Sequence, residues 1–343
     1  MGDEKEKDAV AVAPAAMEAD QGERVWIGFD LGGTKMLATV FDENFKSLGR
    51  ERKKTKGHEG ADTVINRMIE TIKNALTAAE RSEKQVAGIG VGCPGPIDTK
   101  RGMVLEAPNL GWRNVEIRKI LKDEFKTEVA VCNDVDAGVY GEYRFGAGKG
   151  AECLVGIFPG TGVGGGCVYQ GKIFQGRLRS CMEIGHVPIC SDTTMDGAGN
   201  TGSVESVASR LAIAAAIAQA SFRGQIPSLN KKIGTSLGNI RSSVIAEAIA
   251  QNDGTVKKIV QQAGEHLSSA IVTLIHLMAP DIVVLGGGLV EAMPEFFLEL
   301  TQRRVGKRIL TSFADTYEIR VAKLGDDAAV MGAAAWAKQL IEK

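Results

Sequence analysis

The chain has 343 residues, of which 44% are hydrophobic, so it can bury large cores and its length favours two domains over one. Lys and Arg total 41 against 42 for Asp and Glu, so the chain lacks the basic field that holds nucleic acid or an anionic membrane. The composition favours a small neutral or locally neutralised ligand.

The N-terminal residues and the cysteines indicate where the protein works. Residues 1–24 begin with acidic residues and continue with alanines, which is typical of a disordered tail and not of a secretory signal. The chain contains no apolar run of the roughly 20 residues that a transmembrane helix requires. Its cysteines form no CxxC pair, which indicates reduced thiols in a cytoplasmic protein, most of them in the core.

After the tail, the predicted order is strand, glycine-rich turn, strand and helix. The stretch "WIGFDLGGTKMLATVF" (26–41) predicts two strands, and the apolar spacing over 62–80 predicts a helix. A buried strand in "VAGIGVGCPGPID" (86–98) then runs into a Gly/Pro loop. Next come a short helix in "VEIRKILKDEF", a strand in "EVAVC" and a helix in "NDVDAGVYGEYRFGAG".

The same order restarts at residue 153, where "CLVGIFPGTGVGGGCVYQGKIF" again predicts strand, glycine turn and strand. The glycine turns stand at the same offset in "GFDLGGTK" and "GIFPGTGV", which suggests a duplicated α/β unit. Helices at about 204–220 and 255–278, a strand "DIVVLGGGL" and a last helix from Asp326 complete the chain. This alternation predicts an α/β architecture with two lobes and a cleft between them.

Three glycine-rich loops are candidate phosphate sites: "DLGGTK", "PGTGVGGG" and "LGGGL". Their amides can approach an anionic oxygen, and glycine tolerates the positive φ that such turns need. None is a GxxxxGK[ST] loop or a GxGxxG that opens a helix, so the two commonest nucleotide folds are poorly supported. A lone loop of this kind is as often a plain tight turn, but three loops, two of them in matching hairpins, favour phosphate binding.

A second group of residues suits vicinal hydroxyls, because each sugar hydroxyl both donates and accepts a hydrogen bond. Each member also has a structural explanation: Asn133 and Asp134 can form a strand-end turn, and Glu205 can be an exposed charge on its helix. Together they describe a sugar best. The group consists of Asn109, Asn133, Asp134, Glu183, His186 and Glu205.

With these residues in place, the sequence resembles the ROK family of sugar kinases, and in particular the bacterial ATP-dependent glucokinases. The resemblance runs from about residue 25 to the C-terminus and rests on "DLGGTK", "GVGCPGPID", "APNLGW", "NDVDAG", "GTGVGGG", "EIGH" and "VVLGGGL", in the family's order. It implies a two-lobed, actin-like and hexokinase-type (ribonuclease H-like) fold, commonly dimeric. The lobes would be 25–137 and 138–325, with a C-terminal helix, 326–343, that returns to the first.

The resemblance also implies roles for individual residues. Asp134 would accept the proton of the attacking sugar hydroxyl, and Mg²⁺ would bridge the phosphates of ATP, held by Asp30 through water. Lys35 is equally well explained as a solvated charge at the start of its strand. The implied sugar ligands are Gly95, Asn109, Asn133, Glu183, His186 and Glu205. The implied ATP contacts are Asp30, Gly32, Gly33, Thr34, Lys35, Gly160, Thr161, Gly162, Gly286, Gly287 and Gly288.

One departure from the family is substantial. Zinc-binding members carry CxCGxxGC where this chain has "DGAGNTGS", so Asp196, Ala198 and Ser203 stand at the three cysteine positions. His186, the fourth ligand in those relatives, cannot hold a structural zinc alone. We expect a zinc-free loop over 187–204, held by packing and hydrogen bonds, and a looser loop would change sugar affinity or specificity.

Alternatives stay open for the acceptor, the donor and the class of function. Glucose is the leading acceptor, with N-acetylmannosamine, fructose, mannose and allose open because these sugars share most hydroxyls. Polyphosphate is an alternative donor. A non-catalytic sugar-binding or regulatory ROK protein is the alternative of another class, although a pure binder would not need Asp134 and three phosphate loops. A repressor would need a helix-turn-helix, for which the acidic tail is too short.

Overall fold

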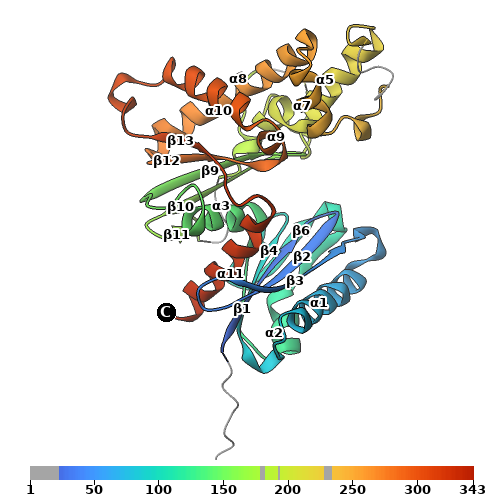
Figure 1. Cartoon of the computed structure of the whole chain (residues 1–343), viewed down its shortest axis with the longest axis vertical. Helices are drawn as coiled ribbons and strands as arrows, with labels where there is room; N and C mark the ends of the chain where they lie inside the picture. Colours follow the sequence, from blue (N-terminus) through green and yellow to red (C-terminus); the bar gives the residue numbers. More distant parts are fainter. Residues whose placement is uncertain (1–22, 178–181, 192–193, 228–233) are drawn as a thin grey trace, which may run out of the picture.

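The structure is a computed structural model that describes residues 23–177, 182–191, 194–227 and 234–343. Within these residues two five-stranded sheets form the centres of two lobes, which lie one above the other in Figure 1. A small third sheet belongs to the first lobe and consists of β5 (Ile97–Asp98), β6 (Met103–Ala107) and β7 (Trp112–Val115).

The first sheet has the strand order β3-β2-β1-β4-β8. Strand β1 pairs antiparallel with β2 and parallel with β4, and both β1 and β4 are buried along almost their whole length. Burial on both faces explains why these strands read as continuous apolar runs without alternation. The strands are β1 (Val25–Leu31), β2 (Lys35–Phe41), β3 (Ser47–Lys54), β4 (Val86–Cys93) and β8 (Val129–Asn133).

The second sheet repeats the first. Its order is β11-β10-β9-β12-β13, and β9 again pairs antiparallel with its hairpin partner and parallel with the next strand. Gly28 and Gly156 each occupy the fourth position of the opening strand. The predicted duplicated α/β unit is therefore confirmed. The strands are β9 (Cys153–Pro159), β10 (Val163–Tyr169), β11 (Lys172–Ile173), β12 (Ile282–Leu285) and β13 (Glu318–Val321).

Each lobe has its own helices. Helices α1 (Ala61–Ala78) and α2 (Ile117–Phe125) pack on the first sheet and share its core. In the second lobe the long helix α8 is the centre of the largest core cluster, which also contains strands β9 and β12. The helices of this lobe are α4 (Val204–Ala208), α5 (Arg210–Phe222), α7 (Ser242–Ala250), α8 (Gly254–Met278), α9 (Gly287–Ala292) and α10 (Pro294–Gly306).

Two helices lie between the sheets (Figure 1): α3 (Asp134–Phe145) and α11 (Ala328–Ile341). They pack against each other, and α11 also packs on β1 and β4. Glycine makes this close approach possible, because a Cβ at Gly28 would lie 1.9 Å from the carbonyl oxygen of Val330. The division into domains at residues 137 and 138 stays a prediction.

Glu142 of α3 accepts hydrogen bonds from both chain segments that connect the two lobes. Its side chain is fully buried, and Oε2 accepts a 2.7 Å hydrogen bond from the amide of Ala147, on the way into β9. Oε1 accepts 2.8 Å bonds from the amides of Lys323 and Leu324, on the way back to α11. The carboxylate of Glu142 therefore anchors the segment that leads into β9 and the segment that leads to α11.

Two of the predicted elements were wrong in part. The helix expected at 204–220 is two helices, because Ser209 is extended (φ −72, ψ 161) and its hydroxyl caps α5 by accepting from the amide of Ala212. The strand expected in "DIVVLGGGL" ends at Leu285, and Gly287 (φ 76) turns the chain into α9.

Two further expectations concern the tail and the cysteines. Almost all of the tail 1–24 lies outside the described residues, as does Cys181. The described cysteines form no disulfide with one another, and four of them, Cys93, Cys132, Cys153 and Cys167, are buried. Within the described residues, no helix is both long and apolar enough to cross a membrane.

Candidate active site

A cavity of about 220 Å³ opens where the two lobes meet. Asp30, Asp134 and Asp326 line it together with Phe158 and Gly287 of the second lobe. Parallel strands β1 and β4 end at the same edge of the first sheet, which places Asp30 beside the start of α3 and hence beside Asp134. The predicted base and the predicted magnesium residue therefore share one cavity.

Asp30 has a buried carboxyl group that lies close to other charges of the cavity. No described residue donates a hydrogen bond to its carboxylate, although Lys35 lies near enough to attract it. Burial, and then repulsion from Asp134, raise its pKa to about 7. A cation or a phosphate-bound metal in the cavity would relieve this repulsion.

Asp134 is the first residue of α3, where the backbone amides of the helix terminus face its carboxylate. Its Oδ1 accepts one hydrogen bond, 3.0 Å from the amide of Val135. Burial raises the pKa of Asp134 against the effect of that bond, and the charge of Glu183 raises it further. A carboxylate with a raised pKa is a better proton acceptor, which suits the role of general base.

The structure brings two predicted sugar residues of the first lobe, Asn133 and Gly95, together beside Asp134, and a third, Asn109, lies beside Gly33. Asn133 caps α3 through Oδ1, which accepts from the amides of Val135 (2.9 Å) and Asp136 (3.3 Å). Its Nδ2 donates to the carbonyl of Gly95 at 3.3 Å. Gly95 has a positive φ of 83° that favours glycine. Asn109 is exposed in a short turn next to Gly33. A Cβ added to Gly33 would lie 3.3 Å from the Cβ of Asn109.

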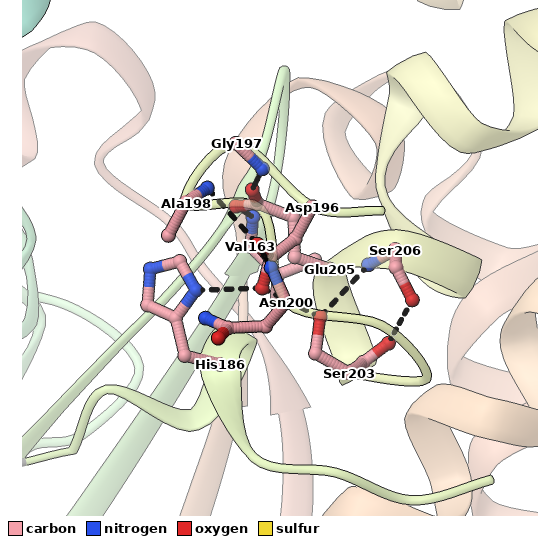
Figure 2. Close-up of polar contacts among 9 residues, drawn as sticks. All are labelled: Val163, His186, Asp196, Gly197, Ala198, Asn200, Ser203, Glu205 and Ser206. Carbon is pink, nitrogen blue, oxygen red and sulfur yellow. Dashed lines mark hydrogen bonds and ion pairs between the residues drawn. The ribbon is translucent and has the colours of Figure 1, made fainter. Parts of the chain in front are cut away.

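The remaining predicted sugar residues form a second group on the other lobe. Glu183 is exposed and precedes the 3₁₀ turn Ile184–His186. Nδ1 of His186 lies 2.9 Å from Oδ2 of Asp196 (Figure 2). Glu205 accepts from the amide of Val163 through Oε2 and from that of Gly197 through Oε1, both at 2.9 Å. The charge of Glu183 contributes to the raised pKa of Asp134, so Glu183 lies within electrostatic range of the first group.

The glycines of the three loops are required for a reason other than the expected positive φ. Of the ten glycines within residues 32–33, 160–166 and 286–288, only Gly287 has a positive φ, so the expectation that these turns need it was wrong. Close packing is the reason instead: a Cβ on Gly162 would lie 2.2 Å from Oε2 of Glu205. A Cβ on Gly160 would meet nothing within 4 Å, and its amide donates a 2.8 Å hydrogen bond to the carbonyl of Gly162 within the turn.

Lys35 has an ionic partner in this structure. Its Nζ lies 3.2 Å from both carboxylate oxygens of Asp326, which also pairs with Arg52 at 2.9 Å. Asp326 lines the cavity, so the pair holds the ammonium group at its edge. A contact between Lys35 and phosphate would require this exposed and therefore weak pair to open.

The donor set of the cavity fits magnesium better than a transition metal. Among the described residues no group of three or more His, Cys, Asp or Glu side chains is arranged to hold a metal ion. Mg²⁺ is held in many enzymes by one or two carboxylates, water and substrate phosphates, so Asp30 alone is a sufficient protein anchor. Its oxygens have no competing hydrogen bond from the described residues.

Sequence reasoning missed four residues at this site. Asp326 and Glu291 line the cavity, and Arg210 donates a 3.0 Å hydrogen bond to Oγ1 of Thr161. Asp196 was interpreted only as the replacement of a cysteine, yet it joins His186 to its loop. The substitution itself was the available signal, because a carboxylate beside a histidine is an unusual replacement for a thiolate.

Comparison with known proteins agrees with the fold and the motifs. A sequence model described as "ROK family" matches residues 26–340. The chain is 34% identical to a glucokinase from Thermotoga maritima over 92% of its own length and 98% of that protein. It is 26% identical to a xylose repressor from Caldicellulosiruptor bescii over 93% of its length and 79% of the repressor.

Solved structures give the same result. A ROK family glucokinase from Streptomyces griseus, solved with glucose and AMPPNP, matches with a TM-score of 0.79 and 28% identity over 92% of this chain and 99% of that one. A ROK hexokinase from Thermus thermophilus matches with a TM-score of 0.77 and 28% identity over 93% and 99% of the two chains.

Proposed function

The chain belongs to the ROK family and is a sugar kinase, and we propose that it transfers the terminal phosphoryl group of ATP to a hexose, with glucose as the first choice. The observation that carries the proposal is the pair of carboxylates, Asp30 and Asp134, in one cavity between two lobes. One of them has no hydrogen-bond partner among the described residues, and the other has a raised pKa at a helix N-terminus.

The proposed reaction needs one proton transfer and one displacement. Asp134 accepts the proton of the sugar hydroxyl as its oxygen attacks the terminal phosphorus of ATP. A new sugar O–P bond forms while the bond from that phosphorus to the bridging oxygen breaks, and ADP leaves. Positioning and charge neutralisation supply most of the rate, because phosphoryl transfer requires little covalent chemistry from the protein.

Substrate binding is proposed to use both lobes. Asn109, Asn133 and Gly95 would contact the sugar from the first lobe, and Glu183, His186 and Glu205 from the second. The loops at Gly32–Thr34, Gly160–Gly162 and Gly286–Gly288, with Lys35, would approach ATP. Mg²⁺, when bound, would neutralise phosphate charge beside Asp30. Ligands from both lobes would close the cleft and exclude water, which competes for the phosphoryl group.

The test of this function is ADP release by the purified protein with Mg-ATP across a panel of hexoses and N-acetylhexosamines. We expect turnover with glucose, and the panel includes mannose, fructose, allose and N-acetylmannosamine as the alternatives. A parallel series with polyphosphate, read by sugar phosphate formation, tests the second donor. Turnover with a sugar other than glucose would correct the acceptor and keep the kinase. A homodimer and a cytoplasmic location stay predictions.

A regulatory, non-catalytic protein is the second candidate, favoured by the similarity to the xylose repressor. It predicts sugar binding by calorimetry without turnover for any sugar or donor. The proposed kinase predicts both, so one panel run with the two readouts separates them.

A further inference from the structure

A cluster of hydrogen bonds centred on Asp196 holds the segment 194–206 together (Figure 2). Its Oδ1 accepts from the amides of Ala198 and Asn200, both at 2.9 Å. Its Oδ2 accepts from Oγ of Ser203 at 2.8 Å and lies 2.9 Å from Nδ1 of His186. The side chain of Asp196 is 0% exposed, so these four bonds enclose the carboxylate completely.

Little else holds this segment in place. Residues 194–201 are exposed apart from Asp196, which is partly covered, so this part of the segment contributes no apolar side chain to the core. Val204, which follows it, is buried in the core of the second lobe. Among the described residues, its backbone pairs through the isolated bridges Pro188–Ser203 and Met195–Thr201 and through a few further backbone hydrogen bonds. Because burial of apolar area cannot order such a loop, the polar cluster must do so.

The cluster reaches two residues that we assign to the sugar. His186 contacts Asp196 directly, and Gly197, the next residue along, donates its amide to Oε1 of Glu205. Oε2 of Glu205 in turn accepts from the amide of Val163, which ends the second glycine loop. We infer that Asp196 is a positioning residue for the sugar site, which orients His186 and holds Glu205 between the loop and the second hairpin. This inference rests on the proposed function.

The orientation of His186 follows from hydrogen-bond chemistry. Burial raises the pKa of Asp196, but the hydrogen bonds it accepts, from His186 first, outweigh this and hold the pKa well below its usual range. An ionised carboxylate only accepts hydrogen bonds, so Nδ1 of His186 must carry the proton. The hydrogen bond to Asp196 also raises the pKa of His186, and above that pKa the neutral ring presents Nε2 as an acceptor. Figure 2 shows that nitrogen directed away from Asp196.

Asp196→Asn tests this inference with almost no change in size. The amide group can accept from the backbone amides, but its NH₂ faces Nδ1 of His186 and turns that nitrogen into an acceptor. Nε2 then becomes a donor, and a sugar hydroxyl oriented toward an acceptor loses its partner. Asp123→Asn is the matched control, because Asp123 is exposed on α2 and has no hydrogen bond or ion pair within the described residues.

We expect the KM for the sugar to rise about tenfold or more in Asp196→Asn, as when residues that orient a binding histidine are removed. The kcat and the KM for ATP should change by less than about threefold, because the cleft carboxylates are untouched. A KM for the sugar within about twofold of wild type would overturn the inference. A joint loss of kcat and of affinity for both substrates would also overturn it, since a merely structural role predicts that pattern.

Two further readouts do not depend on turnover. The imidazole nitrogens of the wild-type protein, labelled with ¹⁵N and assigned with His186→Gln, should show a protonated Nδ1; a proton on Nε2 alone would contradict the inference. Calorimetric binding of glucose separates the two proposals. Binding without turnover would end the proposed function alone, and the same tenfold weakening in Asp196→Asn would still be expected. Absence of both binding and turnover would end both proposals.

Discussion

The cleft and the loop 194–201 each contain a buried carboxylate, Asp30 and Asp196, and the two differ in the hydrogen bonds they accept and in the direction of their pKa shifts. Asp30 accepts no hydrogen bond from the described residues, and its pKa is raised to about 7. Asp196 accepts four, and its pKa is lowered. The first is strained by burial beside Asp134, whereas the second is fully satisfied. The comparison shows how the two kinds of carboxylate differ. A catalytic or metal-binding carboxylate lacks hydrogen-bond donors from the protein, whereas a structural carboxylate has a donor for each of its oxygens.

The largest effect should come from the cleft. Asp134→Asn removes the proton acceptor and should lower kcat by about 10²- to 10⁴-fold, with small changes in KM. Its thermal stability should equal or exceed that of wild type, since burial of the charged form is already unfavourable. Steady-state kinetics and a melting curve on the same preparation check this. A drop in stability with full activity would place Asp134 with the structural carboxylates.

A second satisfied carboxylate sharpens the comparison. Glu142 is fully buried and accepts from the amides of Ala147, Lys323 and Leu324. Glu142→Gln turns one acceptor into a donor opposite a buried amide and should lower the free energy of unfolding by about 1–3 kcal/mol. Urea unfolding measures the change, with Glu299→Gln, on the exposed face of α10, as control. Equal stability of the two variants would contradict the role of Glu142 at the crossings.

The two glycines of the second hairpin loop offer a matched pair. A Cβ on Gly162 would lie 2.2 Å from Glu205, whereas a Cβ on Gly160 would meet nothing within 4 Å. Gly162→Ala should therefore destabilise the protein by about 1–2 kcal/mol by displacing the Glu205 carboxylate. Gly160→Ala should be nearly neutral for stability, because the added methyl group would meet open space. Both are read by melting curves and kinetics, and the reverse order of the melting temperatures would refute the packing argument.

The smallest effect tests the strain at Asp30. Its folded-state pKa, about 7, lies above the ordinary value of 3.8, so the wild type loses stability as pH rises between these values. Asp30→Asn removes the ionisation and should be more stable by about 1 kcal/mol at pH 8, allowing for solvent at the cleft. The advantage should shrink as pH falls toward 4. Unfolding curves in magnesium-free buffer measure it, and an advantage independent of pH would contradict the assignment.

The sequence predicted the parts of the fold that local periodicity determines. Helix α8 was placed within one residue, because Asp253 caps its start and an apolar face runs along it. The two hairpins were recognised because each strand is buried and each turn is glycine-rich. The short strand β13 was not predicted, since only its pairing with β12 makes it a strand.

Sequence reasoning failed where a residue's role depends on a distant partner. Ser209 breaks a helix partly because the next amide, that of Arg210, donates to the carbonyl of Gly160, which no local pattern shows. Gly162 is small because Glu205 lies against it, not because of its φ. Asp196 was interpreted as a missing thiolate, because its four partners become neighbours only in the folded loop.

The most direct test of the comparison is turnover at saturating sugar and Mg-ATP for Asp134→Asn and Asp196→Asn, measured beside wild type. We predict that Asp134→Asn stays at least about a hundredfold slower than wild type at any sugar concentration. Asp196→Asn should recover to within about threefold of wild type once sugar saturates. Equal loss in both variants at saturation would contradict the division between a cleft carboxylate that does chemistry and a loop carboxylate that positions the sugar.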